Sequence, residues 1–155
     1  MLAYRTWEID PCGALRSSCV PYLWTATCNR VPCAQVMLSG LRTLRPCSDP
    51  GPECHCGFQA FPVFSQALES HVAPVCVGLI RAYGQIITCA DETILARLMD
   101  ILALALVLPA QTDAPLVSFR AVCRNLGVPG IVVEREEEAE HWLLLQKEHL
   151  DSILT

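Results

Sequence analysis

The sequence is poor in charge: 17% of its residues are charged, and one of its eleven basic residues is lysine. With 52% hydrophobic residues, the chain has enough apolar surface for a core, which excludes global disorder. Its 155 residues fit one compact domain. We therefore predict a single domain over residues 1–155, with a cysteine-rich part at 1–61 and a strand and helical part at 62–155.

Two kinds of hydrophobic segment are missing. The first ten residues lack the basic and then apolar regions of a signal peptide, so we expect a cytoplasmic protein in a reducing compartment. The most apolar stretch, 94–110, is interrupted by Arg97 and Asp100. A membrane span needs roughly 20 apolar residues. We therefore expect no membrane association and a buried helix at this stretch.

The chain also lacks a basic region. Residues 1–133 carry nine arginines against nine acidic residues, whereas residues 134–155 carry seven acidic residues against two basic ones, so the tail holds the whole net charge of −5. This distribution disfavours general nucleic-acid binding, which depends on neutralising phosphates. Nucleic-acid binding remains an alternative, because arginines and aromatic residues suited to base stacking share the first part: Arg5, Arg16, Arg30, Arg42, Arg45, Trp7, Tyr22 and Trp24.

Local patterns predict a mixed fold of strands and helices. The expected elements, in order, are strands at 4–9 and 22–28, loops at 31–36 and 48–53, a helix at 63–70, one or two strands at 75–88 hinged near Gly84, a long apolar helix from Asp91 to about Leu108, a helix at 116–126 capped by Gly127, a strand at 131–133 and a helix at 136–154. The fold class is therefore α+β, with a strand- and loop-rich, zinc-stabilised N-terminal part packed with a helical C-terminal half.

Cysteine is abundant, with ten residues. Five of them fall within Cys28–Cys56, among proline, glycine, serine, aspartate and arginine. Core cysteines need apolar neighbours, whereas a metal knuckle needs turns, so these five thiols predict a closed zinc site with four ligands. The remaining five fit buried free thiols better: Cys12, Cys19, Cys76, Cys89 and Cys123.

A set of motifs resembles a group of small uncharacterised proteins of actinobacteria and their phages. The matching residues cover roughly the first hundred positions: Arg5 and Trp7, Leu15-Arg16-Ser17, Trp24, Cys28, Cys54-His55-Cys56-Gly57-Phe58-Gln59-Ala60 and Gly78-Leu79-Ile80-Arg81-Ala82-Tyr83-Gly84. The preference for arginine over lysine agrees with a GC-rich genome of that kind. The chain departs from the group after Gly84, where the usual Gly-Tyr-Arg-Ala segment is reduced to Leu95-Ala96-Arg97.

The resemblance implies a zinc site formed by Cys28, Cys47, Cys54 and Cys56, with Cys47 standing where the relatives carry histidine. Cys33 or His55 can replace one of these ligands, and four thiolates suit iron as well as zinc. The resemblance implies no activity, because none is established for the group.

The sequence favours a non-enzymatic protein–protein interaction or regulatory role, with a protein partner. A thiol-dependent enzyme is a further alternative, but His71, His141 and His149 stand in no recognisable catalytic signature. The last helix carries apolar residues that can cover the core or dock a partner: Trp142, Leu143, Leu145, Leu150, Ile153 and Leu154. Its acidic run at 136–140 can attract a basic partner.

The zinc site yields the first testable prediction. Elemental analysis of the purified protein should find about one zinc per chain, because one closed site takes four thiolates. Chelation should then unfold the N-terminal part, since binding of a structural metal is coupled to folding. Protein that contains no metal would contradict the site, whereas iron would change the metal and keep the ligands.

Overall fold

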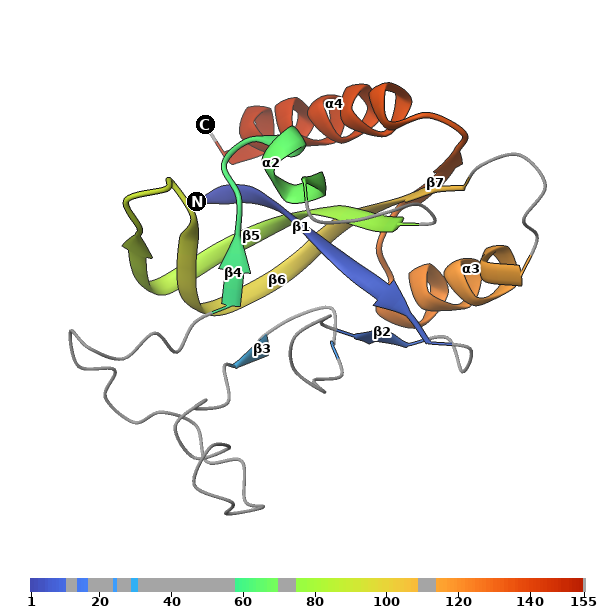
Figure 1. Ribbon diagram of the computed structural model, residues 1–155, viewed down its shortest axis with the longest axis horizontal. Coiled ribbons are helices and arrows are strands. Elements are labelled where there is room, and N and C mark those ends of the chain that lie inside the picture. Colours follow the sequence, from blue (N-terminus) through green and yellow to red (C-terminus); the bar gives the residue numbers. More distant parts are fainter. Residues whose placement is uncertain are drawn as a thin grey trace, which may run out of the picture.

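The computed structural model describes residues 1–10, 14–16, 24, 29–30, 58–69, 75–108 and 114–154. Its centre is a long antiparallel pair of fourteen-residue strands, β5 (Val75–Thr88) and β6 (Ile94–Val107). Strand β1 (Leu2–Ile9) pairs antiparallel with β5, and the short β2 (Leu15–Arg16) pairs with the end of β1. The N-terminal strand predicted at 4–9 is thereby confirmed (Figure 1).

Three short strands share the second edge of β6. Strands β4 (Phe58–Ala60) and β3 (Asn29–Arg30) pair antiparallel with its first half, and β7 (Gly130–Val133) pairs parallel with its last four residues. Phe61, directly after β4, then bridges Tyr4 of β1 through two backbone hydrogen bonds of 2.8 Å. The sheet therefore curls. As a result, the segment 58–61 pairs with β6 through β4 and with β1 through Phe61.

Helices cover both faces of this curled sheet. Helix α3 (Ala114–Leu126) contributes Phe119 and Val122 to the core on one face. Helices α2 (Phe64–Leu68) and α4 (Glu136–Leu154) pack on the opposite face, where Ala139 and Leu143 are fully buried (Figure 1). The positions of α2 and α4 on the same face bring two distant segments of the chain together.

Most elements predicted after residue 61 are confirmed. Helix α2 matches the helix expected at 63–70, α3 and α4 match the two later helices, and β7 matches the strand at 131–133. Strand β5 continues past Gly84, whose φ of 77° accompanies a register shift between Tyr83 and Ile86. Gly127 ends α3 with a φ of 66°, a left-handed conformation that glycine adopts without a steric penalty.

The long helix predicted from Asp91 to about Leu108 is wrong, because this stretch forms strand β6. Leucine and alanine favour helices locally, but a strand buried on both faces is also apolar at nearly every position, so periodicity does not separate the two. Asp91 instead accepts a hydrogen bond of 3.1 Å from the Thr93 amide in the tight turn between β5 and β6. The C-terminal half is consequently a mixture of strands and helices and not a helical half.

The expected elements of the cysteine-rich part mostly lie outside the described residues, including the loops at 31–36 and 48–53. Trp24 is the described residue of the strand predicted at 22–28. It belongs to no strand, although its amide donates a hydrogen bond of 3.2 Å to the Leu15 carbonyl.

The close approach of β5 to its neighbours predicts a strong effect of Gly78→Ala. A Cβ atom at residue 78 would lie 2.6 Å from the Ala103 carbonyl oxygen and 2.9 Å from Cζ3 of Trp7. Backbone cannot move away cheaply, so we expect a loss of about 3 kcal/mol in the free energy of unfolding, measured by urea denaturation. Gly127→Ala is the control, because it meets no atom within 4 Å. It should cost only about 1–2 kcal/mol for its left-handed backbone. A Gly78→Ala protein as stable as the control would contradict this packing.

Candidate functional site

The predicted metal ligands Cys28, Cys47, Cys54 and Cys56 all lie outside the described residues, as do the alternatives Cys33 and His55. The zinc site therefore stays a prediction. Within the part of the chain that the structure describes, no group of three or more His, Cys, Asp or Glu side chains is arranged to hold a metal ion.

Three of the cysteines expected to be free are described, and all three are free thiols. Cys76 is buried in β5, and burial raises the pKa of its thiol far above the usual range. Cys123 and Cys89 are partly buried, and burial also raises the pKa of Cys123. A thiol with a raised pKa holds little thiolate at neutral pH, so Cys76 and Cys123 are poorly suited to nucleophilic chemistry.

The aromatic residues considered for base stacking belong to the core. Trp7 and Trp24 are 1% and 5% exposed and meet edge to face, with ring centroids 5.5 Å apart. The Arg5 guanidinium lies 4.7 Å from the Trp24 ring and donates to the Gln59 carbonyl. Trp7 and Trp24 are therefore not available for the stacking that the nucleic-acid alternative would use, because a nucleobase cannot reach a buried ring.

The remaining members of that set are partly described. Arg16 of β2 pairs with Asp10, the residue after β1, with 2.6 Å between nitrogen and oxygen. Tyr22, Arg42 and Arg45 lie outside the described residues, as does the side chain of Arg30.

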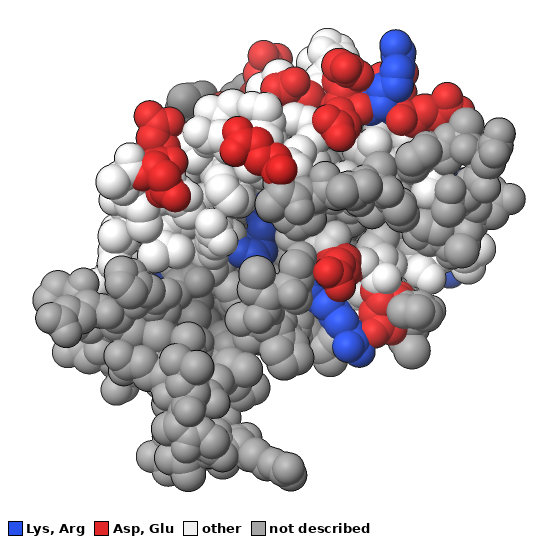
Figure 2. Space-filling model, in the orientation of Figure 1, with Lys and Arg blue, Asp and Glu red and all other residues white. Residues whose placement is uncertain are grey.

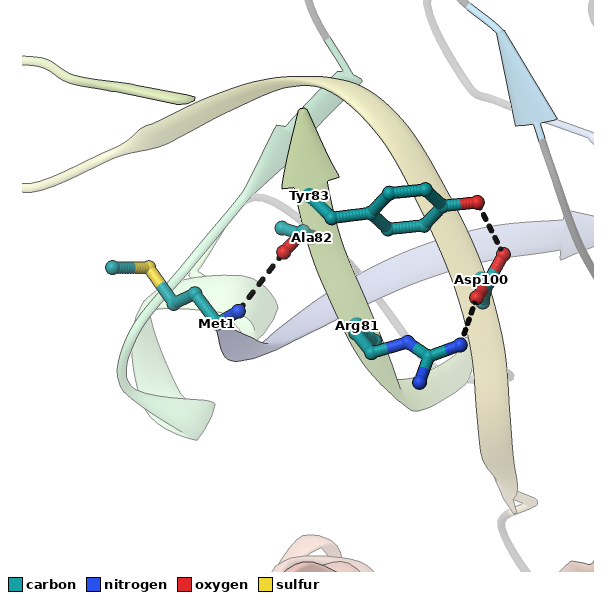
Figure 3. A network of polar contacts seen from close by, with 5 residues as sticks. All are labelled: Met1, Arg81, Ala82, Tyr83 and Asp100. Atoms are coloured by element: carbon teal, nitrogen blue, oxygen red, sulfur yellow. Dashed lines mark hydrogen bonds and ion pairs between the residues drawn. The ribbon is translucent and has the colours of Figure 1, made fainter. Parts of the chain in front are cut away.

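A buried carboxylate on β6 holds two side chains of the neighbouring strand β5 (Figure 3). Asp100 has a side chain 5% exposed, and it accepts hydrogen bonds of 2.6 Å from Arg81 and 2.9 Å from the Tyr83 hydroxyl. The Arg81 guanidinium also lies 5.8 Å from the centroid of the Tyr83 ring. A carboxylate, a phenol and a guanidinium thus compensate one another where an isolated charge would be costly.

A groove lies between α2 and the first turns of α4, with a volume of about 310 Å³. Its floor is apolar, because Phe64 and Leu68 line it with side chains that are almost fully buried. Its other lining residues are Ser65, Glu69, Glu136, Glu137 and Glu140. Figure 2 shows acidic side chains gathered over this part of the surface. No described lysine or arginine lines the groove.

The groove has a local origin in the sequence. The acidic run predicted at 136–140 starts α4, where the partial positive charge of the helix N-terminus favours carboxylates. Arg135, the nearest basic residue along the chain, is paired with Glu138, which does not line the groove. Glu137, which does line the groove, also acts on Arg135 through its charge and helps to raise the pKa of that guanidinium.

Tyr4 of β1 does not line the groove but packs against Phe64, which does. Its side chain is 3% exposed, and its ring meets Phe64 edge to face at 5.8 Å between centroids. Burial raises the pKa of Tyr4, and the nearby carboxylate of Glu140 raises it further.

The apolar face of α4 mainly covers the protein's own core. Leu143 is fully buried, and Trp142 and Leu150 pack against the same cluster. Leu144 and Leu145 are exposed on the other side of the helix. The side chains of Ile153 and Leu154 lie outside the described residues.

The proximity of Tyr4 to Glu140 is testable. Removing the charge with Glu140→Gln should lower the pKa of Tyr4, although burial should keep it above the ordinary value of 10.0. The fold favours the neutral phenol of Tyr4. This group therefore stabilises the folded protein below its ordinary pKa of 10.0, and the stabilisation is lost as the pH rises through the raised pKa of the folded state. Titration of tyrosinate absorbance should show the change in Glu140→Gln and not in Glu148→Gln, an exposed change on the same helix. Identical titrations of the two variants would refute the charge effect of Glu140 on Tyr4.

Comparisons with known proteins give no indication of what the site does. No family of proteins, no characterised protein and no solved structure matches the chain. The likeness to actinobacterial and phage proteins therefore remains an expectation from the motifs. Among the described residues, no helix combines the length and apolar character needed to cross a membrane.

Proposed function

We propose that this is a non-enzymatic interaction protein of the cytoplasm, and that it binds a basic segment of a partner protein in the groove between α2 and α4. The observation that carries the proposal is the convergence of four glutamates over an apolar floor, with no described basic side chain in the lining. The three described free thiols support a reducing compartment.

Helix chemistry alone does not account for this convergence. The macrodipole favours Glu136 and Glu137 in the first turn of α4, but its effect falls off beyond that turn, where Glu140 lies. Glu69 comes from a different helix and stands at the C-terminal end of α2, where the dipole disfavours a negative charge. The helix dipole therefore does not explain why Glu69 and Glu140 carry negative charge at the groove.

The groove combines two features that suit a basic peptide. Carboxylates at its rim steer a cationic segment toward the surface and fix its register. The exposed parts of Phe64 and Leu68 can contact the methylene groups of a lysine or arginine side chain, whose charged end stays near the rim. A peptide segment that is both basic and partly apolar is therefore complementary to the carboxylate rim and to the apolar floor.

We also propose that zinc bound by Cys28, Cys47, Cys54 and Cys56 has a structural and not a catalytic role. Four thiolates close the tetrahedral site and leave no position for a substrate. The raised pKa values of Cys76 and Cys123 argue against thiol chemistry at those two residues. Both points support an interaction role.

The groove is tested by calorimetric titration with a short peptide that carries two lysines between leucines. Binding should weaken as salt rises from about 0.05 M to 0.5 M, since exposed charges are screened within a few ångströms at high salt. The double variant Glu69→Gln/Glu140→Gln should bind roughly tenfold more weakly, because it removes carboxylates from both walls.

The matched control Glu148→Gln removes one charge from the same helix outside the groove and should bind within about twofold of the wild-type protein. Equal binding by the double variant and the wild-type protein would contradict the docking site. Failure of every basic peptide to bind, with a gel shift by RNA that falls steeply with salt, would favour the nucleic-acid alternative.

A further inference from the structure

The last part of β5 forms an open edge of the sheet. Strand β1 accompanies β5 only as far as Ala82, which exchanges backbone hydrogen bonds of 2.8 and 2.9 Å with Met1 (Figure 3). After a register shift between Tyr83 and Ile86, residues 86–88 pair with β6 and with no other described strand. Figure 1 shows this end of β5 at the outer margin of the sheet, with β6 between it and β4.

The backbone of this edge has donors and acceptors that face away from β6. The Cys89 amide donates a hydrogen bond of 2.8 Å to the Thr93 carbonyl, so the backbone of Cys89 faces β6. Because backbone groups alternate between the two sides of a strand, the N–H and C=O groups of Thr88 and Ile86 face the opposite side. No described residue bonds to them there. Unpaired groups of this kind are the template on which a further strand adds to a sheet.

The side chains of the edge also suit a neighbouring strand. The run Ile86-Ile87-Thr88 consists of β-branched residues, which favour strands. Many natural sheets protect an exposed edge with lysine or proline, and residues 84–88 contain neither. Ile87 is 38% exposed and lies opposite Leu95 of β6. An apolar side chain therefore stands at the middle of the open edge.

We infer that two copies of this chain form a dimer in which their open edges pair antiparallel about a two-fold axis at Ile87. Such an axis brings the same surface of each copy together. Ile86 of one copy then pairs with Thr88 of the other, which satisfies the outward N–H and C=O groups of both residues. The two Ile87 side chains meet across the axis as a non-hydrogen-bonded pair, where side chains of neighbouring strands lie closest.

The length of the edge favours a second copy over a long extended peptide. Because β1 occupies the edge of β5 from Ala82 onward, a strand added to residues 86–88 has room for only a few residues. A long peptide would run into β1. In a second copy, the tight turn after Thr88 leads the chain back along its own β6, so the added strand ends before it reaches β1.

Charge favours the same occupant. The antiparallel pairing sets the turn of one copy beside Tyr83 and Arg81 of the other. This turn carries the exposed side chains of Asp91 and Glu92. The Arg81 side chain remains 50% exposed although it is paired with Asp100. Each copy therefore offers an acidic turn to a cationic side chain of its partner, an arrangement that fixes the register of an interface.

Sedimentation velocity tests the dimer. Wild-type protein should associate reversibly, with a dissociation constant on the order of 10–100 µM, as expected of a small interface. Ile87→Lys should weaken association at least tenfold, because like charges would meet across the axis. Leu145→Lys is the matched control, since Leu145 is an apolar residue on α4 with a similar exposure of 47%, and it should associate like the wild-type protein.

A second pair of variants tests the backbone of the edge. Thr88→Pro removes the outward N–H, which the fold of a single copy does not use, and proline is tolerated at such edge positions. It should weaken association about tenfold. Thr88→Val keeps the N–H and the β-branched shape, so it should stay within about twofold of the wild-type protein. Circular dichroism melting of each variant establishes that its fold is intact.

A mixture of two variants locates the axis. Ile87→Lys and Ile87→Glu should each be monomeric alone, because residue 87 faces residue 87 of the other copy. Their equimolar mixture should recover the dimer, since opposite charges then meet at the same place. A structural effect of either substitution would not be reversed by mixing.

Each contrary result identifies what fails. Wild-type protein that remains monomeric at about 500 µM overturns the dimer and leaves the edge to a short strand of another protein. A dimer that persists in both Ile87→Lys and Thr88→Pro overturns the assigned edge. Charged variants that stay monomeric when mixed overturn the axis at Ile87. The groove between α2 and α4 lies on other elements, so its peptide titrations are independent of these outcomes.

Discussion

The pairing of β5 with β6 is the constraint on which the rest of the structure depends. Each strand is fourteen residues long, and every other described strand pairs directly or through β1 with one of these two. Gly78 permits their closest approach, because the space a Cβ would need is taken by the Ala103 carbonyl and the ring of Trp7. The two cores on either side of the sheet follow from side chains that alternate along this pair.

The groove is a consequence of this arrangement, since α2 and α4 are separated by about seventy residues and meet because α2 packs on β1 and α4 packs on β5 and β6, on the same face of the sheet. Tyr4 of β1 belongs to the same core cluster and packs against Phe64. Two segments distant in sequence thereby contribute an apolar floor and four carboxylates to one hollow. The acidity of the groove comes from the surface, whereas its floor belongs to the core.

Local signals predicted those elements whose chemistry is local. The alternation at Tyr4–Ile9, the glycine that ends α3 and the acidic first turn of α4 are each readable within a few residues, and each was confirmed. The prediction for the stretch that forms β6 was wrong because its leucines and alanines favour a helix by propensity. The pairing with β5 that makes it a strand is a tertiary effect. The burial of Trp7 and Trp24 was missed for the same reason.

The candidate site was predictable only in part. The run at 136–140 drew attention to acidic chemistry, but nothing near Tyr4, Phe64 or Glu69 in the sequence connects them with that run. Asp100, which had seemed only to interrupt an apolar stretch, proved to be the centre of a polar network, because its partners Arg81 and Tyr83 stand on the neighbouring strand. The cysteine motif lies in residues that the structure does not describe, so the zinc site remains a prediction.

The edge of β6 has a consequence for the way this chain can change. Arg30 pairs with Leu98 and Phe58 pairs with Ala96, so two segments that are distant in sequence pair with the same edge of β6 at neighbouring positions. An insertion in β6 between Ala96 and Leu98 would change the register of one pairing relative to the other, so this short stretch of β6 restricts the changes that the chain can accept.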